Sequence, residues 1–130
     1  MPIKDPEARK AYHKEYMKKY LQDPENRAKH RQRLKRNKDA NTLINRERIR
    51  ELKELNPCTD CGNTYAPECM DFDHLPQFEK KANIALMVAS GSTWKLISQE
   101  LAKCELVCAN CHRVRTTQRI QKNLPDNYLV

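Results

Sequence analysis

Hydrophobic positions are sparse in the first 56 residues, and those present follow helical spacing. An alanine and three tyrosines recur at every fourth position after Asp5-Pro6, which predicts a helix with one narrow apolar stripe. These residues are Ala8, Tyr12, Tyr16 and Tyr20. Asp23 followed by Pro24 combines a good N-cap with a good first-turn residue, so a second helix is predicted to begin there.

The stretch from residue 27 to residue 36 is polar on nearly every side. A helix without an apolar face has little reason to be stable by itself in water. Apolar residues return between Leu43 and Leu55, and Asn56-Pro57 ends that segment. The first half therefore predicts two or three helices, the last of which packs on the rest of the protein.

The pattern changes at residue 57, from helical spacing to shorter segments. Alternation of apolar and polar side chains predicts two strands, at 69–75 and 104–107. Helices are predicted as one turn at 84–89, a segment from the Gly91-Ser92 cap to Leu101, and a segment from the second cysteine pair to about Lys122. The predicted organisation is a basic helical arm at 1–56 and a small α+β domain at 57–130.

Composition limits the size of the core. Of the 130 residues, 38% are hydrophobic and 32% are charged, and a small domain of this kind usually needs a disulfide or a structural metal. The chain opens Met1-Pro2 without a charged-then-apolar leader, and no apolar run approaches membrane-spanning length. A cytoplasmic protein with no membrane partner is therefore predicted. Thiols stay reduced in that compartment, which favours metal binding over disulfides for the six cysteines.

The excess positive charge lies in the first half of the chain. Residues 1–56 hold 17 Lys and Arg against 9 Asp and Glu, whereas residues 57–130 hold 8 against 8. A basic segment suits a polyanion, and nucleic acid is the predicted partner. The predicted DNA contacts in this segment are Arg27, Arg31, Arg33, Lys35 and Arg36. Taken alone, the charge is equally consistent with a solvated or disordered tail.

Two Cys-x-x-Cys pairs, Cys58/Cys61 and Cys108/Cys111, predict a structural zinc site. Zn²⁺ accepts four thiolates tetrahedrally at about 2.3 Å, and its coordination is then closed. The 46 residues between the pairs mean that one ion would tie both ends of the domain together. The two remaining cysteines, at positions 69 and 104, are predicted to be small buried hydrophobic residues.

Asp73, His74 and His112 form a second candidate cluster. Asp73 and His112 could hold a divalent cation between the first predicted strand and the final helix. His74 points to the other face of the strand and could act as a general base, because a neutral imidazole accepts a proton from water near pH 7. The cation would stabilise charge that develops on a phosphodiester during cleavage. Taken singly, each histidine could instead join a hydrogen bond in the core.

Two segments resemble the HNH endonuclease family: Met70-Asp71-Phe72-Asp73-His74-Leu75, and residues 103–116 with the sequence KCELVCANCHRVRT. The resemblance covers about residues 55–120 and is nearest to the small zinc-bearing members common in bacteriophages. It implies a ββα-metal core, treble-clef-like, with zinc beside it. It also implies that Asp73 and His112 bind the catalytic metal and that His74 is the general base. The implied reaction is hydrolysis of DNA, with double-stranded DNA as the predicted partner, to 5′-phosphate and 3′-hydroxyl ends with Mg²⁺, Mn²⁺ or another divalent ion.

One departure from the family pattern concerns an asparagine nine residues before the final histidine, where this chain has Lys103. That asparagine usually braces the loop and orients the base, and Asn83 or Asn110 could replace it here. Thr116 stands where some members carry a further histidine. The catalytic metal is therefore predicted to have two protein ligands, with water and phosphate completing its shell.

Arg113 and Arg115, on the final predicted helix, are expected to clamp the phosphate backbone, and a solvated helix face is the alternative. The favoured function is a metal-dependent DNA endonuclease. A catalytically inactive, zinc-stabilised nucleic-acid-binding protein is a second interpretation, which the Lys103 departure favours. An accessory nuclease subunit directed by a phage packaging partner is the third. Sequence preference, nicking against double-strand cleavage, and oligomeric state are not predicted.

Overall fold

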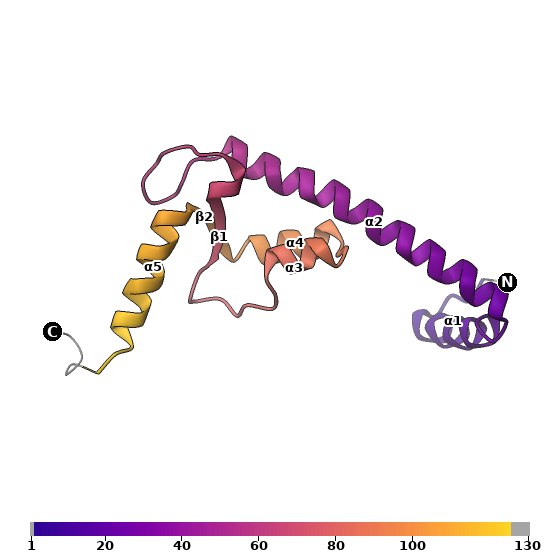
Figure 1. Ribbon diagram of the computed structural model, residues 1–130. Coiled ribbons are helices and arrows are strands. Elements are labelled where there is room, and N and C mark those ends of the chain that lie inside the picture. Colours follow the sequence, from indigo (N-terminus) through magenta and orange to yellow (C-terminus); the bar gives the residue numbers. More distant parts are fainter. Residues whose placement is uncertain (1, 126–130) are drawn as a thin grey trace. The chain divides into compact units, whose positions relative to one another are not determined.

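The structure is a computed structural model that describes residues 2–125 (Figure 1). It is a small, mostly helical α+β protein with a two-stranded sheet. Its elements are α1 Pro6–Tyr20, α2 Pro24–Leu55, a 3-10 turn Pro67–Cys69, β1 Met70–His74, α3 Ile84–Ala89, α4 Trp94–Leu101, β2 Cys104–Cys108 and α5 Ala109–Lys122. The chain divides into two compact units, one up to Asp39 and one from Ala40 onward, so the division falls within α2.

Aspartate side chains begin both long helices. Asp5 accepts hydrogen bonds from the N–H groups of Glu7 and Ala8, at 3.3 and 3.1 Å. Asp23 accepts from the N–H of Glu25 at 2.8 Å, so α2 begins where the sequence predicts. Each carboxylate satisfies helical donors that have no partner within the helix.

The first half contains two helices rather than three, because α2 is continuous. It runs through the polar stretch 27–36 without interruption, and no glycine or proline follows Pro24 before the helix ends. The basic side chains predicted to contact DNA all lie exposed on this helix. They are Arg27, Arg31, Arg33, Lys35 and Arg36.

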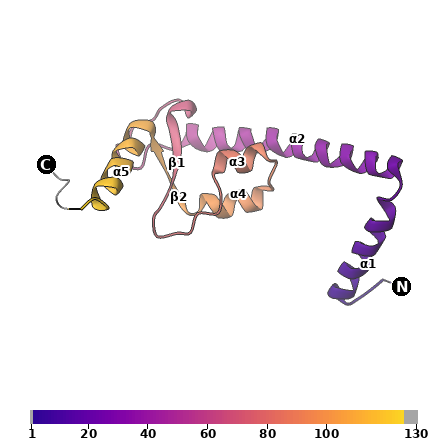
Figure 2. The ribbon, with the colours of Figure 1, turned by 60° about the horizontal axis from the view of Figure 1, so that its bottom comes forward.

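β1 and β2 pair antiparallel, with Met70 opposite Cys108 and His74 opposite Cys104 (Figures 1 and 2). Both strands were predicted to within one residue at each end. Cys69 is an exception, because it lies exposed in the 3-10 turn before β1 and is not a buried strand residue. Cys104, on β2, is half-buried and packs against the hydrophobic cluster beneath the sheet.

Between residues 40 and 125, the second unit has two small hydrophobic clusters. One surrounds the cysteine pairs, and its buried members are Cys58, Met70, Val107 and Cys108. The other joins α3 to α4, with Ile84, Val88 and Ile97 buried at its centre. The first cluster includes Met70 and its strand partner Cys108, whereas the second contacts Cys104, the strand partner of His74, so the clusters lie toward opposite ends of the short sheet. Two small clusters fit a domain with few hydrophobic residues.

The end of α2 packs on the α3–α4 hairpin, as predicted for the last apolar segment of the first half. Ile49 contacts the α3–α4 cluster. The buried Asn45 side chain donates to the carbonyl of Ser92 at 2.8 Å, and Thr42 donates to the carbonyl of Val88 at 3.1 Å. In residues 2–125, no helix has both the length and the apolar character that crossing a bilayer requires.

Candidate functional site

The four cysteines of the two Cys-x-x-Cys pairs converge. The sulfur atoms of Cys58, Cys61, Cys108 and Cys111 all lie within 4.8 Å of one another. Four thiolates around one zinc ion would be about 3.8 Å apart if each bond is about 2.3 Å, so the group fits a tetrahedral ion with little adjustment. Gly62, with φ of +74°, turns the chain after the first pair and donates to the carbonyl of Cys58 at 2.9 Å.

Backbone donors surround the Cys58 sulfur. The N–H of Cys108 donates to it at 3.2 Å, and the N–H of Cys111 donates to the Cys108 sulfur at 3.4 Å. Burial raises the pKa of the Cys58 thiol, but hydrogen bonds from nearby backbone N–H groups outweigh burial and lower this pKa to about 6. A thiolate is the form that binds metal, so the local structure favours a four-cysteine group that can hold an ion such as zinc.

Strand alternation sends neighbouring side chains of β1 to different helices. Asp71 and Asp73 contact α5, through His112 and two arginines. His74 points instead toward α4, where its Nε2 atom lies 2.9 Å from Oε1 of Glu100. The side chains of Asp73 and His74 therefore point to opposite faces of the sheet, as the sequence predicted.

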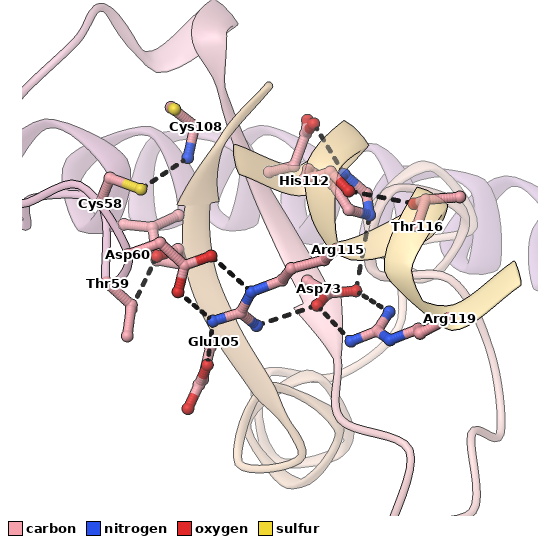
Figure 3. A network of polar contacts seen from close by, with 12 residues as sticks. Cys58, Thr59, Asp60, Asp73, Glu105, Cys108, His112, Arg115, Thr116 and Arg119 are labelled. Atoms are coloured by element: carbon pink, nitrogen blue, oxygen red, sulfur yellow. Dashed lines mark hydrogen bonds and ion pairs between the residues drawn. The ribbon is translucent and has the colours of Figure 1, made fainter. Parts of the chain in front are cut away.

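Asp73 is buried, with 3% of its surface exposed, and two guanidinium groups hold it (Figure 3). Arg119 donates to both carboxylate oxygens, at 2.8 and 2.7 Å, and Arg115 donates to Oδ2 at 3.0 Å. Burial raises the pKa of Asp73, but the hydrogen bonds from Arg119 and Arg115 outweigh burial and lower it below the usual aspartate value. Asp73 is therefore a carboxylate at neutral pH.

His112 lies between two carboxylates. Its Nδ1 atom is 3.1 Å from Oδ2 of Asp71, and its Nε2 atom is 3.5 Å from Oδ1 of Asp73. In a neutral ring that donates from Nδ1 to Asp71, the Nε2 lone pair faces the Asp73 carboxylate. Adjacent ligands on a small cation with bonds of about 2.1 Å are about 3 Å apart, compared with the 3.5 Å between these two atoms. A carboxylate on the second nitrogen is also the usual partner of a metal-binding histidine.

The two predicted arginines of α5 differ in their surroundings. Arg113 is exposed. Arg115 donates to Asp60, Glu105 and Asp73, and its hydrogen bonds to these carboxylates, with Asp60 first, raise the pKa of its guanidinium above the usual value (Figure 3). That these arginines bind the DNA backbone remains a prediction. In the structure, Arg115 instead forms ion pairs with three carboxylates of the protein.

Three side chains that the sequence did not single out belong to the site. Asp71 precedes Asp73 by two residues on the strand, and Arg119 lies seven residues after His112 on α5. A spacing of two on a strand, or of seven on a helix, places side chains on the same face. Both residues could therefore have been predicted from the sequence to lie beside the candidate metal ligands. Glu100 was harder to predict, because the sequence indicates only a possible i,i+3 ion pair with Lys103 near the end of α4.

A groove of about 1120 Å³ brings the candidate groups of the second unit together. Asp73, His74 and His112 all line it. Its cationic lining residues are Arg46, Arg50, Lys53, Lys80 and Arg119. Arg113, Arg115 and the basic residues of 27–36 are not among the residues that line it.

Comparisons of the chain with protein-family models, with curated proteins and with solved structures find no match. The structure contains a four-cysteine group that can bind a metal. It also contains a groove lined by cationic side chains. That groove holds a carboxylate–histidine pair and a second histidine.

Proposed function

We propose that this protein is a metal-dependent endonuclease that hydrolyses phosphodiester bonds in DNA, with an HNH-like ββα-metal core. One observation carries the proposal. The candidate base His74 and the candidate metal ligands Asp73 and His112 line one groove, and five cationic side chains line the same groove. A polyanion with a hydrolysable backbone matches both properties.

The element order is consistent with such a core. Along the chain, α3 and α4 lie between the two antiparallel strands, and α5 follows the second strand directly. Asp73 and His74 come from the first strand and His112 from the first turn of α5, which is the arrangement that the HNH resemblance implies. The four-cysteine group, with zinc bound, would hold the start of α5 against the loop that precedes β1.

Asp73 and His112 would hold a divalent cation, Mg²⁺ or Mn²⁺. When bound, the cation would stabilise the negative charge that develops on the phosphate in the transition state. Arg115 and Arg119 keep Asp73 ionised and fix its orientation. The Arg119 side chain is about one-third exposed and lines the groove, so its guanidinium can also bind a phosphate oxygen.

In the proposed reaction His74 takes a proton from a water molecule as that water attacks phosphorus. The bond between phosphorus and the 3′ oxygen breaks, and this oxygen takes up a proton from solvent. The products are a 5′-phosphate and a 3′-hydroxyl. A single groove with one such base would cut one strand at each encounter.

The cationic wall of the groove supports a nucleic-acid substrate. Arg46, Arg50 and Lys53 recur at spacings of four and three along α2, so they share one helix face. Seven residues of helix rise by about 10 Å, which matches about three nucleotide steps along one strand at 3.4 Å of rise each. These contacts would position the backbone without reading its sequence.

A second function has an observation in its favour. Each candidate catalytic group already has a protein partner: Asp73 is held by two arginines and His74 by Glu100. The same side chains could thus be structural in a zinc-stabilised nucleic-acid-binding protein that does not cut.

End-labelled duplex DNA distinguishes the two functions. The proposal predicts Mg²⁺- or Mn²⁺-dependent fragments with ligatable 5′-phosphate ends, which disappear with His74→Ala. Zinc content is measured in every sample, so that loss of the structural ion is not mistaken for loss of the catalytic one. Retention of the duplex in a gel-shift assay without any cleavage would support the binding protein instead.

A further inference from the structure

Glu100, on α4, is a buried carboxylate with 2% of its surface exposed, and its hydrogen bonds reach three other segments. Its Oε1 atom accepts from Nε2 of His74 at 2.9 Å and from the N–H of Lys81 at 3.0 Å. Its Oε2 atom accepts from Nζ of Lys103 at 2.9 Å. Burial raises the pKa of Glu100, but these donors, led by Lys103, outweigh burial and lower its pKa to about 2. The side chain is therefore ionised at neutral pH.

This contact determines which nitrogen of His74 carries the proton. An ionised carboxylate only accepts hydrogen bonds, so Nε2 of His74 must donate to Glu100. In the neutral ring the lone pair then lies on Nδ1. His74 lines the groove, so Nδ1 is the atom left to accept a proton there.

Lys103 connects the same carboxylate to the loop after β1. Its Nζ atom donates to the carbonyl of Glu79 at 2.8 Å as well as to Glu100. Together with the bond from the N–H of Lys81, two hydrogen bonds thus tie this loop to the end of α4. Lys103 occupies the position where the HNH resemblance leads one to expect the bracing asparagine. In this chain the loop after β1 is therefore held by the Glu100–Lys103 ion pair instead of an asparagine.

We propose that Glu100 is the positioning residue for His74, and that Lys103 fixes the orientation of the Glu100 carboxylate. The inference rests on the proposed nuclease function, in which His74 is the base. Glu100 does not touch the reacting atoms. It holds the imidazole in the tautomer with a free Nδ1, while Lys103 and the backbone of the loop prevent the carboxylate from turning away.

The variant Glu100→Gln tests the tautomer directly. The Lys103 ammonium only donates, so it would draw the amide oxygen toward Lys103 and leave the amide NH₂ facing Nε2 of His74. This orientation also gives up the hydrogen bond that the Lys81 N–H donates to Glu100. His74 would then accept at Nε2 and carry its proton on Nδ1, where the proton blocks the base. Loss of the correct histidine tautomer in other hydrolases lowers kcat by about 10⁴-fold, and we expect a fall in kcat of at least roughly 10²-fold with KM nearly unchanged.

The double variant Glu100→Gln/Lys103→Met separates positioning from mere packing. Without the ammonium, the amide oxygen can turn back to His74 and the Lys81 N–H. We expect kcat to recover by about tenfold or more relative to Glu100→Gln, and the Nε2–H tautomer to return. A structural role would instead make the double variant worse than either single one. Glu51→Gln, the same change at an exposed site on α2, is the matched control.

Nitrogen-15 NMR of the imidazole in the wild-type, zinc-loaded protein gives a readout that needs neither activity nor a variant. Proton on Nε2 of His74 is the expected result, and proton on Nδ1 would overturn the proposal. If wild type cuts DNA while Glu100→Gln retains its kcat, the positioning role is wrong and the nuclease stands. If wild type does not cut, the nuclease function fails, and the tautomer is still measured.

Discussion

Arg115 on α5 holds both carboxylate oxygens of Asp60, with Nε and a terminal nitrogen each 2.6 Å from an oxygen (Figure 3). Asp60 lies between Cys58 and Cys61, so this bidentate pair links the first cysteine turn to the helix that carries Cys111. The same guanidinium donates to Asp73. One side chain therefore connects the four-cysteine group to the candidate active-site carboxylate.

Replacing Arg115 is expected to destabilise the second unit. Arg115→Ala would leave the buried Asp73 with one guanidinium partner fewer and free the Asp60 turn, at a cost of about 2–4 kcal/mol in unfolding free energy. Chemical denaturation of zinc-loaded protein measures it. Arg113→Ala, two residues earlier and exposed, should change stability by less than about 0.5 kcal/mol. Equal effects of the two changes would contradict this account of Arg115.

Removal of a cysteine from the four-cysteine group should cost both metal and stability. Cys61→Ser is expected to lower zinc content well below one ion per chain and to lower Tm strongly, because metal binding contributes directly to the folding of small metal-stapled domains. Elemental analysis and a thermal scan measure these effects. Cys69→Ser is the matched control, since its thiol is exposed and outside the group. A Cys61→Ser protein with full zinc content and unchanged Tm would show that the group is not the metal site.

Asn45 is predicted to be the polar anchor of α2 on the α3–α4 hairpin. Asn45→Ala removes the donor to the Ser92 carbonyl and leaves that acceptor without this bond, at a cost of about 1–3 kcal/mol. Urea titration measures it. Ile44→Ala, on the exposed side of the same helix, should cost less than about 0.5 kcal/mol although it removes more apolar surface. A larger loss for Ile44→Ala would mean that α2 packs through a different face.

The cationic residues of the groove are expected to affect both DNA binding and cleavage, whereas the basic stretch 27–36 is expected to affect binding alone. Changing Arg46, Arg50 and Lys53 together to glutamine should reduce the salt dependence of binding by up to about 0.9 in log–log slope per lost phosphate contact. It should also lower kcat, because the scissile phosphate is no longer held beside His74.

The matched control changes Arg31, Arg33 and Arg36 to glutamine, which removes the same charge from exposed positions. This variant should weaken binding and yet cleave at the wild-type rate once DNA is saturating. Filter binding over a salt series, followed by single-turnover cleavage, separates the two effects. Loss of kcat in the control, with none in the groove variant, would place the active backbone contact on the first unit.

Local signals in the sequence predicted the parts of the fold that depend on neighbouring residues. Alternation located β1 and β2, and the Asp23 carboxylate marked the start of α2. Cys69 was misjudged because Pro67 begins a 3-10 turn that ends only where β1 starts, which leaves the cysteine exposed. Alternation alone does not reveal that turn.

The partners of the candidate groups were harder to predict, because they depend on how helices dock on the sheet. Glu100 meets His74 across 26 residues, and Arg119 meets Asp73 across 46. Charge, spacing and helix propensity do not determine such pairings, since each of these residues could equally lie on a solvated helix face. The residue types at the site were readable from the sequence, whereas the ion-pair network that orients them required tertiary structure.

Cleavage of supercoiled plasmid tests the central claim most directly. Wild-type, zinc-loaded protein is incubated with plasmid and Mg²⁺ or Mn²⁺, beside His74→Ala, Cys69→Ser and a chelated sample whose zinc content is verified. The account predicts nicked circles with wild type and Cys69→Ser, and none with His74→Ala or without the divalent cation. Intact plasmid in the wild-type sample at every metal and salt concentration, with the DNA nevertheless bound, would contradict it.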